Sequence, residues 1–276
     1  MAAPFQDVAV LFGDSITNQQ HEDGSMQARF SAAYRRKLDI LNRGYGGYNT
    51  RWTRLLFDTI FAKKEDAARV PAVRLVTIWF GANDSVLPDA EQKVRQHVPL
   101  AEYTANLRFF LDALTSPTSP YAAAHGKGLN IVLVTPPPIY PPAMGGGPFA
   151  RERDPAVSAQ YAAAVRALGA EYAALESDEG NWRVGVVDMW SAVIRAAGGE
   201  GDELRAFLSD GLHLTSRGYG VFWDEYTALV RGHLRGRGLD WEDVEDLPLR
   251  MPNFENVDAD NPSTVVTGMR LPPIRQ

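Results

Sequence analysis

The sequence predicts an α/β protein with a parallel sheet of about five strands and helices on both faces. Two observations support this fold class. Short, uninterrupted apolar runs recur along the 276-residue chain, and longer segments between them carry apolar residues at helical spacing. An apolar run without alternation is typical of a strand buried on both faces, as in a parallel sheet. We therefore expect a doubly wound sandwich in which strands alternate with helices along the chain.

Five apolar runs are the expected strands. The first, Val8 to Phe12, and the third, Leu75 to Phe80, are strong, whereas the second, Asp39 to Asn42, is weaker. The fourth and fifth are Ile131 to Val134 and Val184 to Val187. In an open α/β sheet, ligands bind outside the carboxyl ends of the strands, so the residues that follow each run are the first candidates for a functional site.

Three intervening segments show apolar stripes with steps of three and four residues, which predict helices that pack on the core. Asp154-Pro155 is a favourable start for the second of them, because aspartate is a preferred N-cap and proline a preferred first-turn residue. The stripes are Tyr103, Leu107, Phe110, Leu111 and Leu114; Val157, Tyr161, Val165, Leu168, Tyr172 and Leu175; and Tyr219, Phe222, Tyr226, Leu229 and Val230.

Two stretches have no sustained period. Thr135 to Pro148 contains three consecutive prolines and three consecutive glycines, so it is an expected loop after the fourth strand. Residues 247–276 are rich in Pro, Asn and Asp. We therefore assign residues 1–246 to one domain and residues 247–276 to a C-terminal tail that is either packed or partly disordered.

Composition excludes several classes of function. The formal net charge of −6 gives no electrostatic reason to expect nucleic acid or an anionic membrane as a partner. The chain has no cysteine, which excludes disulfides, thiolate metal sites and a cysteine nucleophile. The first residues lack the basic region and apolar run of a signal peptide, and Val8 to Phe12 is far too short to span a membrane. We expect a cytoplasmic protein without membrane insertion.

Gly13-Asp14-Ser15 directly follows the first expected strand. A serine there sits at a strand-to-helix turn, and Gly13 lets the backbone bend sharply. Ser15 is therefore a candidate nucleophile. The alternative is a serine that caps a helix in an ordinary turn, and the tripeptide alone favours that alternative.

Asp210-Gly211-Leu212-His213 lies near the end of the domain. A spacing of three in a turn or short helix brings both side chains to one face. The carboxylate can then hold the Nδ1–H of the ring and leave Nε2 free to take a proton. The alternative is a surface pair beside a helix start, since Thr215-Ser216 is a plausible cap.

Two further segments follow expected strands and offer hydrogen-bond donors. Gly81-Ala82-Asn83-Asp84 follows the third strand, and the amide of Asn83 could donate to an oxyanion. Gly44 to Asn49 follows the second strand and offers backbone N–H groups at the same edge. The alternatives are an asparagine turn and a flexible glycine turn. Together, however, the four segments supply a nucleophile, a base, an orienting carboxylate and two donors.

These four segments resemble the SGNH, or GDSL-type, hydrolase superfamily, and they occur in the family's order. The resemblance covers roughly residues 7 to 235, with isoleucine at position 16 where the motif's name has leucine. The chain also resembles the isoamyl acetate-hydrolysing esterase branch, although its tail is longer than that branch leads us to expect. The segments that carry this closer resemblance are Asn42 to Trp52, Gln96 to Leu100, Pro136 to Pro138 and Ser209 to Leu214.

The resemblance implies a flavodoxin-like three-layer α/β/α sandwich that hydrolyses carboxylic esters without a metal or cofactor. It implies that Ser15 is the nucleophile and that Asp210 and His213 complete the triad. The backbone N–H groups of Ser15 and Gly47 and the side-chain amide of Asn83 would form the oxyanion hole. Gly47 is preferred to Gly46 on the alignment alone.

The branch further implies a small-molecule substrate, a short acyl ester of a medium-sized alcohol. A thioesterase, a lipase or a carbohydrate deacetylase on the same scaffold is an alternative, as is a catalytically silent binding module. The residues that bind substrate are unknown, and His97 is the one candidate for a substrate contact. We expect no metal, because His21-Glu22 does not continue to a second histidine at the spacing of a zinc protease helix.

The tail leads to an expectation about partners. It contains eight large apolar residues, more than an exposed segment comfortably carries: Leu249, Met251, Phe254, Val265, Val266, Met269, Leu271 and Ile274. We expect the tail to pack, either across its own domain or onto a second subunit in a homodimer, and we favour the homodimer because two-fold symmetry uses each contact twice.

Overall fold

The computed structural model describes residues 6–19, 22–90, 94–177 and 180–270. At its centre lies an all-parallel sheet of five strands in the order β2-β1-β3-β4-β5. This is the flavodoxin-like order, and it confirms the predicted fold class. The strands are β1 (Asp7–Gly13), β2 (Leu38–Gly44), β3 (Val73–Trp79), β4 (Leu129–Val134) and β5 (Trp182–Val187).

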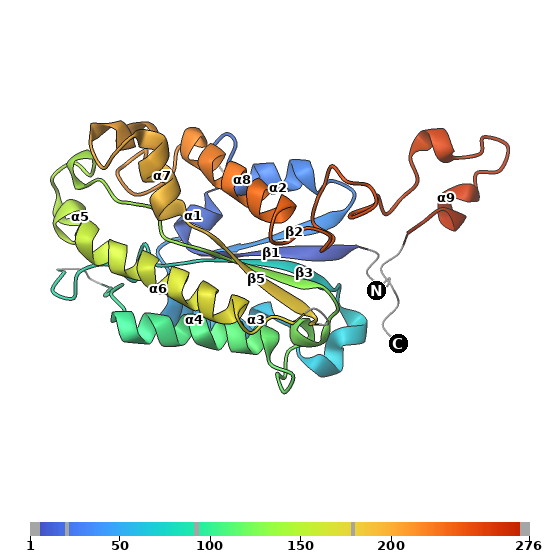
Figure 1. Cartoon of the computed structure of the whole chain (residues 1–276), viewed down its shortest axis with the longest axis horizontal. Helices are drawn as coiled ribbons and strands as arrows, with labels where there is room; N and C mark the ends of the chain where they lie inside the picture. Colours follow the sequence, from blue (N-terminus) through green and yellow to red (C-terminus); the bar gives the residue numbers. More distant parts are fainter. Residues whose placement is uncertain (1–5, 20–21, 91–93, 178–179, 271–276) are drawn as a thin grey trace.

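Helices form a layer on each face of the sheet (Figure 1). One layer contains α1 (Ser15–Asn18), α2 (Met26–Ala33), α7 (Met189–Ala197) and α8 (Ser216–Arg231). The other contains α3 (Thr50–Ile60), α4 (Leu100–Thr115) and α6 (Pro155–Ala173). The short helix α5 (Pro148–Arg151) follows the expected proline- and glycine-rich loop. Short 3₁₀ turns lie at Lys64–Arg69, Ala122–His125, Pro141–Ala143, Asp202–Ala206 and Phe254–Asn256.

The sheet divides the interior into two apolar cores. Successive residues of β1 alternate between them: Leu11 packs with one core and Phe12 with the other. The ring of Phe12 lies 5.2 Å from that of Phe110 on α4, whereas Trp79 lies 5.1 Å from Phe222 on α8, between ring centroids. The inner strands β1, β3 and β4 are therefore buried on both faces, and this explains why their apolar runs show no alternation, whereas the edge strand β2 is mostly part-buried.

The expected strands and helical stripes lie in the observed elements, except for Phe80, one residue beyond β3, and Leu175. Asp154 caps α6 by accepting a hydrogen bond from the N–H of Ala156 at 2.7 Å, and Pro155 occupies the first turn, as expected. The prediction that Leu175 packs on the core is wrong. Helix α6 ends at Ala173, so Leu175 lies beyond its buried stripe, and 62% of its surface is exposed.

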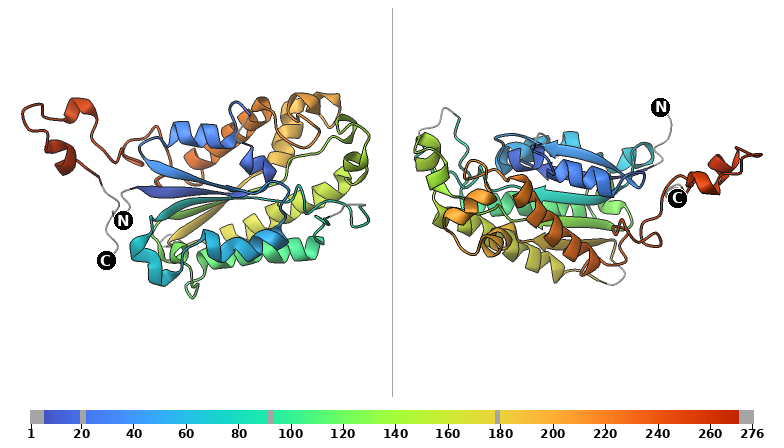
Figure 2. Two further views of the ribbon diagram at one scale, coloured as in Figure 1. Left: turned by 180° about the vertical axis from the view of Figure 1, so that it is seen from behind. Right: turned by 90° about the horizontal axis from the view of Figure 1, so that it is seen from above.

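The chain stays against the body as far as Arg250, past the predicted domain boundary at residue 246. Leu247 is buried, and the guanidinium of Arg250 lies 3.0 Å from a carboxylate oxygen of Asp7. Beyond this anchor the tail projects away from the domain and carries α9 (Thr264–Thr267) (Figures 1 and 2). The N–H of Arg270 returns to the carbonyl of Arg250 at 2.9 Å. Residues 271–276 lie outside the described residues. No helix within the described ranges is both long and apolar enough to cross a membrane.

Candidate active site

The three candidate loops meet because their strands are neighbours. In the sheet register Gly13 at the end of β1 pairs with Gly44 of β2 on one side and with Trp79 of β3 on the other. The loops that follow these strands therefore leave the sheet side by side. This places the segments after Gly13, Gly44 and Trp79 at one edge, as expected for parallel strands.

Gly13 is required by close packing at the end of β1. A Cβ at this position would lie 2.6 Å from the carbonyl oxygen of Trp79 and 2.1 Å from the hydroxyl of Thr17. The single-turn helix α1 then begins at Ser15, and its cap is Asp14, whose carboxylate accepts from the N–H of Ile16 at 2.9 Å. Because Asp14 provides the cap, the alternative reading of Ser15 as a capping residue does not describe this turn.

The hydroxyl of Ser15 begins a row of side-chain hydrogen bonds. Its Oγ lies 2.8 Å from Nε2 of His213, which is 198 residues away in the sequence. The other ring nitrogen, Nδ1, lies 2.7 Å from Oδ2 of Asp210. An ionised carboxylate can only accept, so Nδ1 carries the proton and Nε2 is left to accept one from the hydroxyl.

The orientation of Asp210 is fixed by its other oxygen. Oδ1 accepts from the backbone N–H groups of Leu212 at 3.0 Å and His213 at 2.8 Å. Partial burial alone would raise the pKa of Asp210, but the hydrogen bonds from the His213 ring and these N–H groups outweigh it and hold that pKa well below its usual range. Asp210 is therefore ionised at neutral pH. The capping of α8 falls to Thr215, which accepts from the N–H of Gly218 at 3.2 Å.

Gly47 and Asn83 lie beside each other. Asn83 is almost fully buried, and its Nδ2 donates to the carbonyl of Tyr48, next to Gly47, at 2.8 Å. Gly47 has φ +78°, a conformation that favours glycine, whereas Gly46 is not in that region. The two glycines thus differ in backbone conformation. Donation by Ser15, Gly47 and Asn83 to an oxyanion stays a prediction.

Replacing Asn83 with alanine should lower kcat by about 10²–10³ and change KM little, because the amide would act on charge that develops only in the transition state. Steady-state kinetics on a chromogenic acetate ester checks this. Asn181→Ala is the matched control, since Asn181 is exposed and its carbonyl binds the N–H of Leu129, at the opposite end of the sheet. A large rise in KM at unchanged kcat would instead make Asn83 a residue that binds the ground state.

Three ionisable side chains, Asp14, Asp84 and Arg153, are buried beneath these loops. Burial raises the pKa of Asp14 to about 7 and that of Asp84 to about 6. The charge of Asp84 adds to the rise at Asp14, and both carboxylates add to the rise that burial causes in the pKa of Tyr103. Asp84 is held by the backbone N–H and hydroxyl of Thr50 at the start of α3. Arg153 donates to the carbonyl of Ala82, beside Asn83. Burial lowers its pKa to about 10, against the attraction of Asp14, so it stays charged at neutral pH.

The buried carboxyl of Asp14 should make stability depend on pH. Its pKa is raised from 3.8 to about 7, so the folded state binds the proton more tightly than the unfolded state. The stability that the protonated Asp14 carboxyl contributes is complete below pH 3.8 and is lost as pH rises through about 7. The free energy of unfolding of Asp14→Asn minus that of the native protein should therefore be larger at pH 8 than near pH 4. We expect this increase to be on the order of 1–4 kcal/mol.

Urea unfolding of both proteins at the two pH values measures this difference. Asp224→Asn is the control, because Asp224 is exposed on α8. A gain that is the same at both pH values would mean that Asp14 is not the source of the pH dependence.

His97 is not brought to the triad by any contact that the structure records. Its Nδ1 lies 2.6 Å from the carbonyl oxygen of Val86, so Nδ1 donates and the ring is held by the segment that follows β3. Its contact with substrate stays a prediction. Within the described residues, no group of three or more His, Asp or Glu side chains could hold a metal ion. His21 lies outside those residues.

Sequence patterns missed the groups that support the site. Gln96 contacts both Gly47 and Asn83, and Arg153 holds the carbonyl of Ala82. Gln96 stands directly before His97, the candidate for a substrate contact, and Arg153 stands directly before Asp154, the cap of α6. Gln96 lies in the segment Gln96 to Leu100 that carries the closer family resemblance, but the resemblance gives it no role, and Arg153 belongs to no stripe or motif. Only their contacts identify what the two side chains do.

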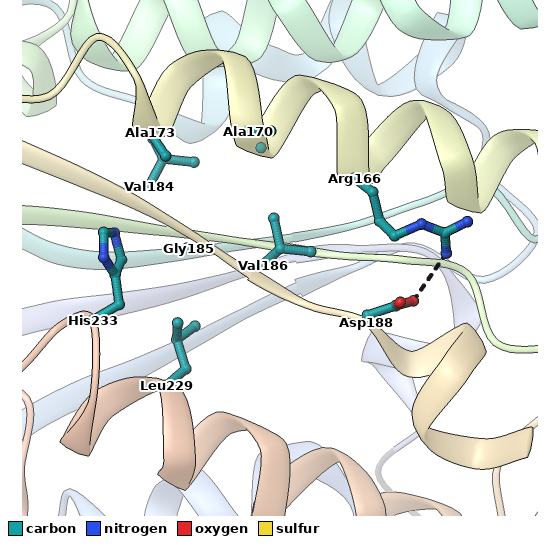
Figure 3. A pocket seen from close by; sticks show the side chains of 10 residues that line it. Arg166, Ala170, Ala173, Val184, Gly185, Val186, Asp188, Leu229 and His233 are labelled. Carbon is teal, nitrogen blue, oxygen red and sulfur yellow. Dashed lines mark hydrogen bonds and ion pairs between the residues drawn. The ribbon is translucent and has the colours of Figure 1, made fainter. Parts of the chain in front are cut away.

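A groove of about 390 Å³ lies away from the site, along the outer edge of β5 between α6 and α8 (Figure 3). Apolar side chains such as Val186 and Leu229 line it, and the ion pair of Arg166 and Asp188, at 3.2 Å, closes one end. None of its lining residues belongs to the triad or to the loops around Gly47 and Asn83.

Comparison with known proteins identifies relatives over most of the chain. Residues 11–221 match the family model described as the GDSL-like Lipase/Acylhydrolase family. A GDSL esterase/lipase of Arabidopsis thaliana is 36% identical over 272 residues, covering 92% of this chain and 95% of the relative. An isoamyl acetate-hydrolyzing esterase 1 homolog of Mus musculus is 32% identical over 260 residues, covering 94% of this chain and 91% of the relative.

Solved structures share the fold at lower identity. A lipase/acylhydrolase from Enterococcus faecalis has a TM-score of 0.55 and 20% identity, and the match covers 83% of this chain and 97% of that one. Axe2, an acetylxylan esterase from Geobacillus stearothermophilus, has a TM-score of 0.53 and 20% identity, with 87% and 98% covered. At this identity the likeness supports the fold alone.

Proposed function

The chain belongs to the GDSL-like lipase/acylhydrolase family and is a carboxylic ester hydrolase, and on that premise we propose that it cleaves short-chain esters through an acyl-serine intermediate on Ser15. The observation that carries this proposal is the unbroken row of hydrogen bonds from Ser15 through His213 to Asp210. It supplies a nucleophile, a general base in the correct tautomer and a carboxylate that orients the base.

Each proton in the proposed reaction has a donor and an acceptor. As Oγ of Ser15 attacks the ester carbonyl carbon, Nε2 of His213 takes the hydroxyl proton, and Asp210 stabilises the imidazolium. The tetrahedral oxyanion receives hydrogen bonds from the N–H groups of Ser15 and Gly47 and from the amide of Asn83. It then collapses, the C–O bond to the alcohol breaks, and His213 returns the proton to the leaving oxygen. Water attacks the acyl-serine by the same steps and releases the acid.

We propose acetate-like esters of medium-sized alcohols as substrates. Relatives in cattle, human, rat and mouse are named for isoamyl acetate hydrolysis, which supports a short acyl group. The ring of Tyr48, on the turn next to Asn83, is partly exposed and packs edge-on against Trp52 at 5.6 Å between centroids. An exposed aromatic surface at this turn suits the apolar part of an alcohol.

A panel of substrates tests the acyl preference. Nitrophenyl esters from acetyl to dodecanoyl, isoamyl acetate, an acetyl thioester and acetylated xylo-oligosaccharide are compared by kcat/KM, with the Ser15→Ala variant as the blank. Nitrophenyl acetate and isoamyl acetate should give the highest kcat/KM. A maximum at long acyl chains would favour a lipase, and maxima at the thioester or the sugar would favour a thioesterase or a deacetylase. Absence of turnover on every substrate would leave a binding module.

We further propose that the part of the tail beyond Arg250 docks on a second copy of the chain to form a homodimer. The large side chains of Phe254 and Val266 are 78% and 67% exposed in the single chain. Burying a large apolar side chain contributes about 1.5–3 kcal/mol, and two-fold symmetry doubles each contact. The ion pair of Arg250 with Asp7 holds the base of the tail, so less chain entropy is lost on docking.

Light scattering tests the homodimer. The full chain should have the mass of a dimer, and truncation after Met251 should give monomers that keep activity on a small ester. This truncation point spares the buried anchor at Arg250. Phe254→Asp should weaken the dimer, whereas Leu55→Asp, at an 80% exposed position on α3, should not. A full chain with the mass of a monomer would remove this proposal and leave packing on its own domain as the alternative.

A further inference from the structure

We propose that Gln96 is a positioning residue that fixes the orientation of the Asn83 amide in the oxyanion hole. Its Nε2 lies 2.8 Å from the carbonyl oxygen of Gly47 and 3.2 Å from Oδ1 of Asn83. One amide group thus contacts both of the segments that are expected to supply oxyanion donors. The inference rests on the proposed esterase function, because it assigns a role that matters only if Asn83 donates to an oxyanion.

Two backbone carbonyls determine the direction of every hydrogen bond in this row of amides. The carbonyl of Gly47 can only accept, so the Gln96 atom that faces it is the nitrogen. The second N–H of this nitrogen needs an acceptor, which is Oδ1 of Asn83. The remaining end of the Asn83 amide is then Nδ2, and it faces the carbonyl of Tyr48, which again can only accept. The two ends of the row therefore agree on a single orientation of Asn83.

This orientation decides what Asn83 offers to the reaction. With Oδ1 turned to Gln96, one N–H of Nδ2 goes to Tyr48 and the second is available to an oxyanion. With the amide reversed, Oδ1 would face the carbonyl of Tyr48 and present a lone pair where a donor is needed. Without Gln96, the contact with Tyr48 is the one hydrogen bond of the Asn83 amide among the described residues that opposes that reversal, so the donor would be held in place for less of the time.

Gln96 is itself held from the other side of the site. Its carbonyl accepts from Nδ2 of Asn49, a fully buried side chain whose Oδ1 caps α3 by accepting from the N–H of Trp52 at 3.0 Å. Two residues later, the N–H of Val98 donates to the carbonyl of Asp84 at 3.0 Å. The backbone around Gln96 is thus tied to the loops after both β2 and β3, which is the support that a preorganised donor requires.

A double-mutant cycle tests the inference on the full chain with nitrophenyl acetate. Gln96→Ala should lower kcat by about 10- to 100-fold and change KM by less than about threefold, because the donor acts in the transition state. In an Asn83→Ala background the same change should lower kcat by less than about threefold, since its target is gone. Gln96→Met, which keeps the volume of the side chain, should behave like Gln96→Ala.

Reversal of the hydrogen-bond polarity gives a second readout. The ionised carboxylate of Gln96→Glu can only accept, so it opposes the carbonyl of Gly47 and favours the reversed Asn83 amide. Its kcat should fall below that of Gln96→Ala. Gln160→Ala on α6 is the matched control, because Gln160 is exposed and its Nε2 donates to the carbonyl of Ala156 within its own helix.

Several results would overturn the inference. They are an equal loss of kcat in the native and Asn83→Ala backgrounds, a rise in KM at unchanged kcat, or Gln96→Glu with native kcat. Unfolding temperatures for each variant identify any loss that comes from instability. The proposed function fails separately: in that case the native chain shows no turnover that depends on Ser15, whereas failure of this inference alone leaves Ser15-dependent turnover intact in Gln96→Ala.

Discussion

Replacing Ser15 with alanine is expected to reduce ester turnover by about 10⁴–10⁶ and to leave the fold intact. The hydroxyl is the start of the hydrogen-bonded row, and without it no atom at this position can form the acyl-enzyme. The turn itself does not depend on the hydroxyl. Asp14 provides the cap of α1, and Gly13 provides the close approach to β3. The loss should therefore appear in kcat and not in the free energy of unfolding.

The measurement is single-turnover and steady-state kinetics on nitrophenyl acetate, with urea unfolding as the check on stability. The native chain should show a burst of nitrophenol equal to the enzyme concentration if deacylation is slower than acylation, and the variant should show none. Ser31→Ala is a matched control on α2, where the exposed hydroxyl accepts from the side chain of Gln27 one turn away. Near-native turnover by a well-folded Ser15→Ala variant would remove Ser15 as the nucleophile.

Replacing Asp210 with asparagine is expected to reduce kcat by about 10⁴, although the side chain keeps its shape. The two backbone N–H groups of Leu212 and His213 need an acceptor, so the amide oxygen of the asparagine takes the place of Oδ1. Its NH₂ group must then face Nδ1 of His213. An NH₂ group can only donate, which forces Nδ1 to accept and moves the proton to Nε2. The histidine would then point a donor at Ser15 and could not take its proton.

Kinetics on nitrophenyl acetate for the single and double variants checks this. In a Ser15→Ala background, Asp210→Asn should cause no further loss, since the group that needs the base is absent. Asp224→Asn on the exposed face of α8 is the control for a change of net charge. An Asp210→Asn variant with native kcat would mean that another group orients His213.

Much of the fold follows from local patterns. The five apolar runs fall within β1 to β5, apart from Phe80 at the end of the third run. The strong runs follow because a strand buried on both faces needs apolar side chains at every position, and the second run is weaker because the edge strand β2 is mostly part-buried. The stripe from Tyr103 to Leu114 lies in α4, because helical spacing places those residues on one buried face. Leu175 was misplaced because the pattern continues past Ala173 although the helix does not, and helix ends are set by capping and tertiary contacts.

The candidate triad could also be proposed from the sequence. Asp210 and His213 are three residues apart, so local geometry alone can bring the carboxylate to the ring. Ser15 required more, because 198 residues separate it from His213. Its position directly after a strand, together with the resemblance to a known family, was the signal that placed it near the base.

The sequence by itself thus determined the fold class, the strands and the chemical types of the candidate site, because these depend on periodicity and on short-range spacing. Only the tertiary structure decided which groups support the site. Gln96 reaches Asn83 and Gly47 across loops, Arg153 reaches Ala82 from the start of α6, and Arg250 reaches Asp7 from the tail. Each contact joins residues from different elements and depends on the relative placement of whole elements. No local pattern encodes that placement, because a single long-range hydrogen bond leaves no period in the sequence.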